Sequence, residues 1–381
     1  MKVLILGGGM IGGTIARDLA KDSGVEVILA DADSAILEPQ NSAPDLTTLV
    51  LDVTDSAALS AATGEADLVV GAVPGHLGYR SIETVIKAGK PIVDISFMPE
   101  DPFTLNDLAI AQGDTAIVDA GVSPGLGNLI IGRFHEEYEE VDRFTCFVGG
   151  LPEERHWPFE YQSVFSPVDV IEEYTRLARM KSGGRIVVRP PLSDLELVDF
   201  PQVGTLEAFS SDGLRTLLTT LPIPYMKEKT LRYPGHADRI RMLLEVGFFA
   251  EETVEVDGVM VSPRALTSKL LFDAWSPKGQ GRDLTVMRVL IEGRLGGNYV
   301  KTTVDLYDAY DSATATTAMA RTTGYTCAAV ARLVLQGTYA EPGIHPLEHV
   351  GANKEAYHHV LEDLNAREVF LQIQQEVAAE S

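Results

Sequence analysis

Three glycines near the start of the chain have the spacing of a phosphate-binding turn. Gly7, Gly9 and Gly12 form the pattern G-x-G-x-x-G directly after an apolar run at residues 3–6. In a β-turn-α-β unit the first glycine permits the tight turn, the second lets the backbone approach a pyrophosphate, and the third lets helix and strand pack closely. The free N–H groups and the positive dipole end of the helix favour the anion. The predicted contacts in this turn are Gly7, Gly9, Met10, Ile11 and Gly12.

An acidic residue follows at the position that selects between dinucleotides. Asp31 closes a second predicted strand, residues 25–30, about 20 residues beyond the glycine motif. A carboxylate at this place accepts hydrogen bonds from the ribose hydroxyls of the adenosine half. Because a 2′-phosphate would meet a like charge there, the sequence predicts NAD as the cofactor rather than NADP, and therefore hydride chemistry.

Short apolar runs alternate with helical patterns up to about residue 119. This alternation predicts a Rossmann-type doubly wound parallel sheet, an α/β fold whose ligand lies at the carboxyl ends of the strands. The further predicted strands are residues 47–51, 67–72, 91–95 and 115–119. Their ends supply the remaining predicted cofactor contacts, which are Asp52, Val53, Val73, Pro74, Ser96 and Gly121.

From residue 144 the pattern becomes strand-like, with few helical periods. This texture predicts an α+β substrate and dimerisation domain with a mainly antiparallel sheet. An apolar helical pattern returns near residues 318–335, so we expect the nucleotide domain to be discontinuous. The predicted boundaries are residues 1–123 and 322–381 for the NAD-binding domain, and residues 124–321 for the substrate-binding, catalytic domain.

The composition excludes several classes of partner. There are 31 basic and 55 acidic side chains, a net charge of −24, which argues against nucleic acid and against an anionic membrane surface. The sequence contains no run of 18 apolar residues, and we expect neither a signal peptide nor a membrane span. Cys146 and Cys327 stand alone, without metal-ligand spacing, so we expect no metal site and no disulfide. We also expect a cytoplasmic location and a homodimer.

Several phrases go beyond a generic dinucleotide-binding pattern. They resemble the saccharopine dehydrogenase-like family, and within it most the NAD-dependent lysine 6-dehydrogenases. The phrases are VDISFMPEDPF at residues 93–103, DAGVSPGLGNLIIGR at 119–133, VGGLP at 148–152, LEAFSSDGLRTLL at 206–218 and LRYPGH at 231–236. Saccharopine reductases usually carry an aspartate where this chain has Ser123, which favours the lysine enzymes. Leu177 stands where those enzymes tend to have a proline, which points the other way.

The resemblance implies oxidative deamination of an amino acid, L-lysine. Hydride would pass from the ε-carbon to NAD, water would release ammonia from the imine, and the 6-semialdehyde would cyclise to piperideine-6-carboxylate. Two alternatives stay open. The first is a saccharopine or carboxylated-polyamine dehydrogenase or reductase, which acts on a secondary amine. The second is an NAD-binding sensor without catalysis.

Such a reaction needs a cation for the substrate carboxylate, an acid for its ammonium and a base for the ε-proton. Arg232 is predicted for the carboxylate, because the matching arginine of saccharopine reductases is placed to hold one. Glu207, Asp212 and Glu160 are candidates for the ammonium, and none ranks above the others. A lysine ε-amine has a pKa of about 10.4, so a group must remove its proton near neutrality. The candidates for that base are His76, His236, Tyr161 and Asp119.

Overall fold

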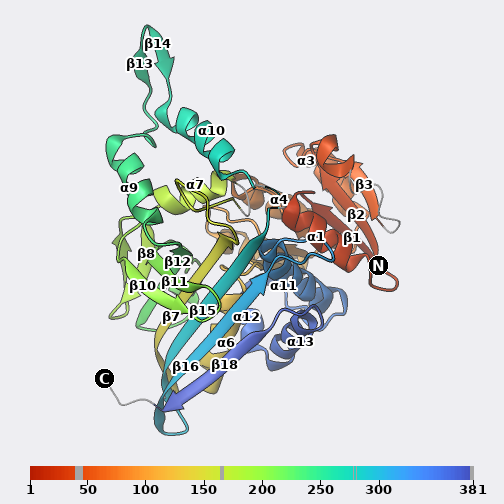
Figure 1. The fold of residues 1–381 in the computed structure, drawn as a ribbon. Coiled ribbons are helices and arrows are strands. Elements are labelled where there is room, and N and C mark those ends of the chain that lie inside the picture. Colours follow the sequence, from red (N-terminus) through yellow and green to blue (C-terminus); the bar gives the residue numbers. More distant parts are fainter. Residues whose placement is uncertain (39–45, 164–166, 278, 280, 378–381) are drawn as a thin grey trace. The chain divides into compact units, whose positions relative to one another are not determined.

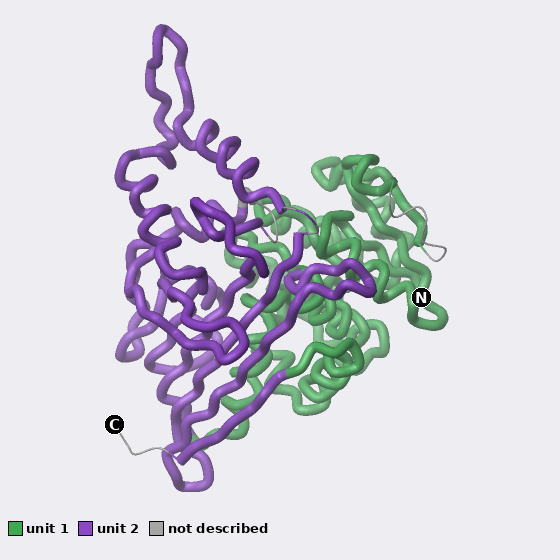
Figure 2. The backbone as a smooth tube through the Cα atoms, in the orientation of Figure 1, with its two compact units in different colours: residues 1–139, 320–370 green, residues 140–319, 371–381 purple. Residues whose placement is uncertain are grey.

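The chain folds into two compact units (Figure 2). The structure is a computed structural model that describes residues 1–38, 46–163, 167–277, 279 and 281–377. Unit 1 consists of residues 1–139 and 320–370, and unit 2 of residues 140–319 and 371–381. Each unit is therefore built from two separate stretches of sequence.

Apart from a shift of two residues at position 320, these units differ from the predicted domain boundaries in two places. Helix α6 (Leu126–Glu137) belongs to unit 1, where Gly132 lies directly against the backbone of Glu348 in α12 (Leu347–Ala352). A Cβ on Gly132 would lie 2.2 Å from the Glu348 carbonyl oxygen, so the close approach of the two helices requires glycine. The other difference is β18 (Leu371–Val377). It belongs to unit 2 because it pairs antiparallel with β16 (Asn298–Ala309).

Unit 1 is built on a seven-stranded parallel sheet in the order β17-β6-β5-β4-β1-β2-β3. Figure 1 shows β1, β2 and β3 of this sheet side by side. Its central strands are almost wholly buried, as expected for a parallel sheet covered by helices on both faces. The predicted Rossmann-type sheet is confirmed. The strands are β1 (Lys2–Leu6), β2 (Glu26–Asp31), β3 (Leu46–Val50), β4 (Leu68–Gly71), β5 (Ile92–Asp94), β6 (Thr115–Val118) and β17 (Gly343–Pro346).

The helices of unit 1 begin at residues that cap them well. Asp33, Asp55 and Asn353 each accept a backbone N–H of the first helical turn with their side chains. Besides α6 and α12, these helices are α1 (Met10–Leu19), α2 (Ser34–Leu37), α3 (Ser56–Gly64), α4 (Gly75–Lys87), α5 (Asn106–Gln112), α11 (Ala318–Leu335) and α13 (Lys354–Asn365). Helix α11 has the bounds that the sequence predicts.

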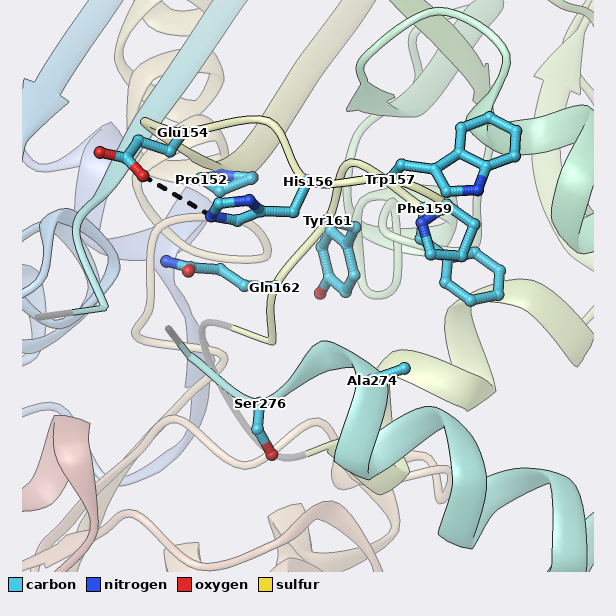
Figure 3. Close-up of a pocket in the computed structure, with 10 residues that line it drawn as sticks. Pro152, Glu154, His156, Trp157, Phe159, Tyr161, Gln162, Ala274 and Ser276 are labelled. Atoms are coloured by element: carbon cyan, nitrogen blue, oxygen red, sulfur yellow. Dashed lines mark ion pairs between the residues drawn. The ribbon is translucent and has the colours of Figure 1, made fainter. Parts of the chain in front are cut away.

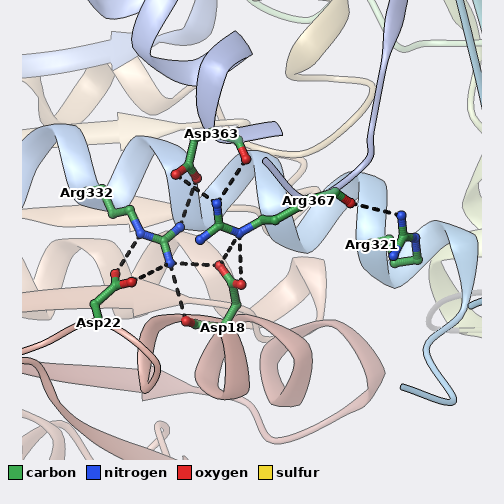
Figure 4. A network of polar contacts seen from close by, with 6 residues as sticks. All are labelled: Asp18, Asp22, Arg321, Arg332, Asp363 and Arg367. Atoms are coloured by element: carbon green, nitrogen blue, oxygen red, sulfur yellow. Dashed lines mark hydrogen bonds and ion pairs between the residues drawn. The ribbon is translucent and has the colours of Figure 1, made fainter. Parts of the chain in front are cut away.

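A partly buried ion-pair network joins three segments of unit 1 that lie far apart in the sequence (Figure 4). Arg332 of α11 contacts Asp22 at 2.6 Å, Asp18 at 2.8 Å and Asp363 at 2.9 Å. Arg367 contacts Asp18 and Asp363, both at 2.8 Å. Two guanidinium groups thus face three carboxylates, and the network fixes α11 and α13 against the end of α1.

Unit 2 contains a nine-stranded sheet that is mixed but mainly antiparallel, as predicted. Its main path runs β10-β11-β12-β7-β15-β16-β18, with β8 and β9 attached beside β12; the β7–β12 pair is parallel. The strands are β7 (Glu140–Pro152), β8 (Ala178–Ser182), β9 (Arg185–Arg189), β10 (Glu196–Phe200), β11 (Gly204–Ser210), β12 (Tyr225–Arg232), β15 (Asp283–Leu295), β16 and β18. A separate hairpin joins β13 (Val254–Val256) to β14 (Val259–Val261) and carries its own two-stranded sheet.

Helices are more prominent in unit 2 than the sequence predicts. Helices α7 (Pro167–Thr175), α9 (His236–Val246) and α10 (Pro263–Trp275) contribute to one hydrophobic core, and α8 (Leu217–Thr220) is a short turn. The sequence pattern does not predict these helices, because aromatic residues, which have a low helix propensity, fill this core. They include Tyr161, Tyr174, Phe209 and Trp275. No helix in the described part of the chain is both long and apolar enough to cross a membrane.

Candidate active site

The glycine turn lies where the order of the parallel strands reverses. Strand β1 has β2 on one side and β4 on the other, and ligands of such sheets bind outside the carboxyl ends at this point. Gly7 has a φ of +100°, and a Cβ there would lie 2.4 Å from the carbonyl oxygen of Ala72. A Cβ on Gly12 would lie 1.9 Å from the Gly7 oxygen, whereas Gly9, the N-cap of α1, faces open space. The turn therefore requires its first and third glycines and leaves the second open to a ligand.

Asp31 holds this turn. Its carboxylate accepts the backbone N–H of Gly8 at 2.7 Å and that of Asp33 at 2.9 Å. Met10, the first residue of α1, is exposed, and Ile11, the second, is half-buried. The residues fit a dinucleotide, because open backbone N–H groups and a ribose acceptor stand at one edge of the sheet.

Asp52 and Val53 lie one strand further out, after β3. The Asp52 carboxylate accepts both the backbone N–H and the hydroxyl of Thr54, at 2.9 and 2.7 Å. These hydrogen bonds lower the pKa of Asp52. The carboxylate is exposed and shapes the turn that leads into α3.

The later strand ends are more tightly packed than the sequence suggests. Ser96 is buried, and its hydroxyl and backbone N–H both donate to the carboxylate of Asp94. Val73 is buried and Pro74 is the N-cap of α4, while His76 is exposed in the first turn of that helix. Asp119 and Gly121, the last two predicted strand-end residues, are both buried. Asp119 follows β6 with a φ of 54°, and Gly121 forms an isolated β-bridge with Gly125.

In unit 2, Arg232 lies at the end of β12 and is only 3% exposed. Its Nε donates to the hydroxyl of Tyr174 at 3.1 Å, and one terminal nitrogen donates to Glu173 at 2.6 Å. The other terminal nitrogen donates to the carbonyl of Leu231 at 2.9 Å. The guanidinium carbon lies 4.6 Å from the ring centroid of Tyr161, a cation–π contact.

His236 completes a chain of hydrogen bonds whose directions follow from its partners and its burial. Its Nδ1 lies 2.9 Å from the carbonyl oxygen of Phe159, which can only accept, so Nδ1 carries the proton. Burial and the nearby Arg232 charge lower the pKa of His236 to about 3, so the ring is neutral and Nε2 is an acceptor. Tyr174 therefore donates its proton to Nε2 over 2.9 Å and accepts from Arg232. Both nitrogens of His236 are engaged, which fits a positioning role rather than the predicted role of base.

Tyr161 does not fit that role either. Its side chain is 5% exposed, and burial raises the pKa of its hydroxyl well above the usual value. With its pKa raised, the hydroxyl keeps its proton near neutral pH and is a hydrogen-bond donor. Of the four predicted bases, His76 and Asp119 remain.

The three acids predicted for the substrate ammonium have other partners. Glu207 accepts the backbone N–H groups of Gly235 and Ala237, at 3.0 and 2.8 Å, at the start of α9. Asp212 forms a bidentate pair with Arg179, at 2.8 Å for both bonds. Glu160 pairs with Arg155 and Arg239. These contacts fit structural roles.

A pocket lies beside the Arg232 cluster within unit 2 (Figure 3). It is lined by Pro152, Glu154, His156, Trp157, Pro158, Phe159, Tyr161, Gln162, Ala274 and Ser276. Tyr161 and Phe159 belong both to this lining and to the aromatic core around His236. The pocket therefore shares two aromatic side chains with the packing around His236.

Two family models match nearly the whole chain. Residues 3–117 match the saccharopine dehydrogenase NADP binding domain, and residues 121–369 match the saccharopine dehydrogenase C-terminal domain. The chain belongs to the saccharopine dehydrogenase family. The predicted resemblance is confirmed at this level, and the glycine turn and the Arg232 cluster lie in the two parts of an oxidoreductase of this family.

Curated members of the saccharopine dehydrogenase family show what this chain is similar to. Saccharopine dehydrogenase (NADP(+), L-glutamate-forming) of Pyricularia oryzae is 27% identical over 267 residues, 66% of this chain and 58% of the relative. Alpha-aminoadipic semialdehyde synthase of Arabidopsis thaliana is 26% identical over 249 residues, 60% of this chain. The match spans only 23% of that protein, and less than two thirds of either relative.

Two further comparisons extend over most of the chain. Carboxynorspermidine synthase of Vibrio cholerae is 23% identical over 390 aligned residues, 91% of this chain and 92% of the relative. The structure of apo saccharopine dehydrogenase (L-Glu forming) from Saccharomyces cerevisiae aligns with a TM-score of 0.80 at 18% identity. It covers 99% of this chain and all of that one, so the two share the saccharopine dehydrogenase fold.

The sequence does not predict Glu173 and Tyr174 as site residues, although both are hydrogen-bonded to Arg232. They lie 59 and 58 residues before Arg232, on α7, and no local pattern links them to it. The available signal was an acid and a tyrosine directly before Thr175 and Arg176, within a helix that the strand-like texture concealed.

Proposed function

We propose that this chain is an NAD-dependent dehydrogenase that oxidises the ε-amine of L-lysine. The ε-carbon would lose a hydride, which bound NAD accepts. Water would then replace nitrogen at the resulting imine, releasing ammonia, and the 6-semialdehyde would cyclise to piperideine-6-carboxylate. In this reaction Arg232 holds the α-carboxylate.

The observation that carries the proposal is how the arginines of unit 2 are engaged. A lysine substrate needs one carboxylate site, whereas saccharopine needs more than one. Arg232 uses three of its five N–H donors on Tyr174, Glu173 and the Leu231 carbonyl, which leaves one on each terminal nitrogen. Arg179 is bidentate on Asp212, and Arg176 lies 3.7 Å from Glu172. Arg176 and Arg179, two of the three arginines that could hold a second carboxylate, are therefore already ion-paired, and the third, Arg215, is buried.

Asp31 supports NAD as the cofactor. Its carboxylate lies at the glycine turn, so a 2′-phosphate near the ribose would meet a negative charge. The matching family model and the Pyricularia relative carry NADP in their names, which makes the cofactor a direct test of the proposal.

A second candidate is favoured by the carboxynorspermidine synthase of Vibrio cholerae. That relative is similar over more than nine tenths of both chains, unlike the longer saccharopine relatives. The corresponding function here would be reduction or oxidation of a secondary amine on a carboxylated polyamine.

The experiment is absorbance at the reduced-nicotinamide band, with purified protein at about pH 9. Parallel reactions contain L-lysine, saccharopine or a carboxylated polyamine, each with NAD and with NADP. Signal with lysine and NAD, lost in Arg232→Ala, is the expected result. Signal with saccharopine alone, or with the polyamine alone, would overturn the lysine proposal and identify the secondary-amine reaction.

A further inference from the structure

The hairpin of β13 and β14 forms an arm, residues 251–261, that stands clear of the large sheet of unit 2 (Figure 1). Each of the residues 251–260 is exposed. A two-stranded hairpin alone is at best marginally stable in water, because it buries too little apolar surface. The register of this one nevertheless gathers four valines on one face, and three of them are 48–62% exposed. An exposed apolar face of this kind is typical of a surface that a partner covers. The four are Val254, Val256, Val259 and Val261.

The arm is also acidic. It contains four carboxylates and no basic residue. Glu251 pairs with Arg264 at 2.6 Å, at the base of the arm. The other three, Glu252, Glu255 and Asp257, form no ion pair with any residue that the structure describes. The surface that covers the arm should therefore combine apolar and positively charged side chains.

The hairpin of β8 and β9 has the complementary charge. Residues 176–190 contain five basic side chains and no acidic one, in a chain whose net charge is −24. Two of the five are paired with acids of unit 2, as described above. The remaining three, Lys181, Arg185 and Arg189, have no carboxylate partner in the described ranges.

This second hairpin exposes apolar side chains beside its charges. Ile186 and Val188 are both 51% exposed, and the register places them on one face of the hairpin, together with Lys181. Strand β9 pairs only with β8 in the described sheet, so its other edge is open. Because the arm and this surface are both exposed within one copy of the chain, neither covers the other. Unit 2 thus carries two uncovered surfaces of opposite charge, each with apolar side chains.

We infer that the arm of one copy of this chain docks on the β8–β9 hairpin of a second copy. The valine face packs on Ile186 and Val188, and the unpaired carboxylates of the arm meet the unpaired cations of the other hairpin. A second copy is favoured over a different protein because the complementary surface belongs to this same chain. A twofold axis makes every contact occur twice, so two copies exchange arms in one closed dimer. The inference is independent of the proposed function.

Charge reversal on each side tests the contact. One variant carries Arg185→Glu and Arg189→Glu, and the other carries Glu252→Lys and Glu255→Lys. All four positions are exposed, so both variants should keep the melting temperature of the parent. We expect each variant alone to self-associate at least about tenfold more weakly in analytical ultracentrifugation, because like charges then face each other. An equimolar mixture should regain the association of the parent, since both contacts in the mixed dimer join opposite charges.

The control changes the charge by the same amount elsewhere. Lys21→Glu with Lys354→Glu alters two exposed lysines of unit 1 and should associate as the parent does. A monomeric parent at micromolar concentration, or association that survives in both charge-reversed variants, would overturn the inference. So would a mixture of the two that associates no better than either alone.

A thiol crosslink identifies the two surfaces directly. The variant with Val256→Cys and Ile186→Cys in one chain is treated with a short bis-maleimide, while the native Cys146 and Cys327 are buried. We expect a product of twice the chain mass. Val256→Cys combined with Ile110→Cys, which is exposed in α5, should give none. Equal yields in the two proteins, or no product in the first, would refute docking of the arm on β9.

Discussion

Tyr174 donates its hydroxyl proton to Nε2 of His236 across 2.9 Å. The same oxygen accepts from Nε of Arg232 at 3.1 Å, so one tyrosine links a neutral imidazole to a guanidinium. Because His236 is anchored in turn on the Phe159 carbonyl, the orientation of Arg232 is set from behind by a chain of three hydrogen bonds.

Removing the Tyr174 hydroxyl breaks two of those bonds at once. We expect Tyr174→Phe to lower the free energy of unfolding by about 1–3 kcal/mol, because His236 and Arg232 each lose a buried partner. It also raises KM for the amino-acid substrate more than it lowers kcat, since Arg232 is misplaced rather than absent. Urea unfolding followed by tryptophan fluorescence reports on unit 2, where both tryptophans lie. A variant as stable as the parent with an unchanged KM would contradict this role, and Tyr225→Phe serves as control.

Glu228 makes the stability of unit 2 depend on pH. It is buried in β12, where its carboxyl accepts from the Ser211 hydroxyl at 2.6 Å, and burial raises its pKa from 4.5 to about 7. The folded state therefore holds this proton more tightly than the unfolded state. The resulting stabilisation is complete below pH 4.5 and is lost as pH rises through 7, amounting to about 3 kcal/mol.

The corresponding variant is Glu228→Gln, which keeps the acceptor for Ser211 without the charge. We expect it to match the parent near pH 5 and to exceed it in urea-unfolding midpoint at pH 8. Equal midpoints at both pH values would show that Glu228 ionises at its ordinary pKa.

The cofactor preference is tested by Asp31→Asn. The substitution removes the charge that faces a 2′-phosphate and weakens the contact to the ribose, so the ratio of KM for NADP to KM for NAD should fall about tenfold. Asp33→Asn removes an equal charge two residues away and still caps α2, so its ratio should equal that of the parent. A parent enzyme that already prefers NADP would refute the interpretation of Asp31.

The network around Arg332 predicts a measurable loss of stability in unit 1. Arg332→Met removes the ion-pair partner of Asp22 and one of the two partners of Asp18, which keeps Arg367, so calorimetry should show a loss of about 1–3 kcal/mol. Lys87→Gln breaks the exposed pair with Glu83 and should cost less than about 1 kcal/mol. Similar small losses in both variants would mean that the network adds little.

Turnover with lysine should climb steeply from pH 7 toward about 9 to 10. The substrate ammonium, with a pKa of about 10.4, must lose a proton before hydride can leave the ε-carbon. The buried His236 and Tyr174 do not titrate in this range, because the pKa of His236 is about 3 and that of Tyr174 about 12. A kcat/KM profile that is flat between pH 7 and 9 would require a base with a pKa below 7.

The features that the sequence predicts well are local ones. The glycine turn, Asp31 and the bounds of α11 depend on residues within one or two turns of each other. Strand β17 has no such signal, because its four residues include Gly343 and Pro346, which are typical of loops. Pairing with β6 alone makes it a strand. Strand β18 is likewise an exposed, polar segment whose place is set by β16.

Within the candidate site, the sequence identifies Arg232 but not its surroundings. Its partners come from α7, some 60 residues earlier, and only the folded core brings them together. For His236 the sequence gives a residue type that ordinarily titrates near pH 6.5, and only burial shows that it is neutral. The residue type alone therefore predicts the charge of Arg232, because an arginine stays charged. It does not predict the protonation state of His236.

The late arrival of β17 has a consequence for the synthesis of the chain. The hydroxyl of Thr115, at the start of β6, donates to the carbonyl of Glu341 at 2.9 Å, although 226 residues separate the two. At ribosomal rates of about 5–20 residues per second, the open edge of β6 waits roughly 10–50 s for its neighbour. During that interval the whole of residues 140–319 emerges, rich in strands that could pair with an open edge. The edge of β6 that pairs with β17 therefore lacks its partner strand until about nine tenths of the chain has been made.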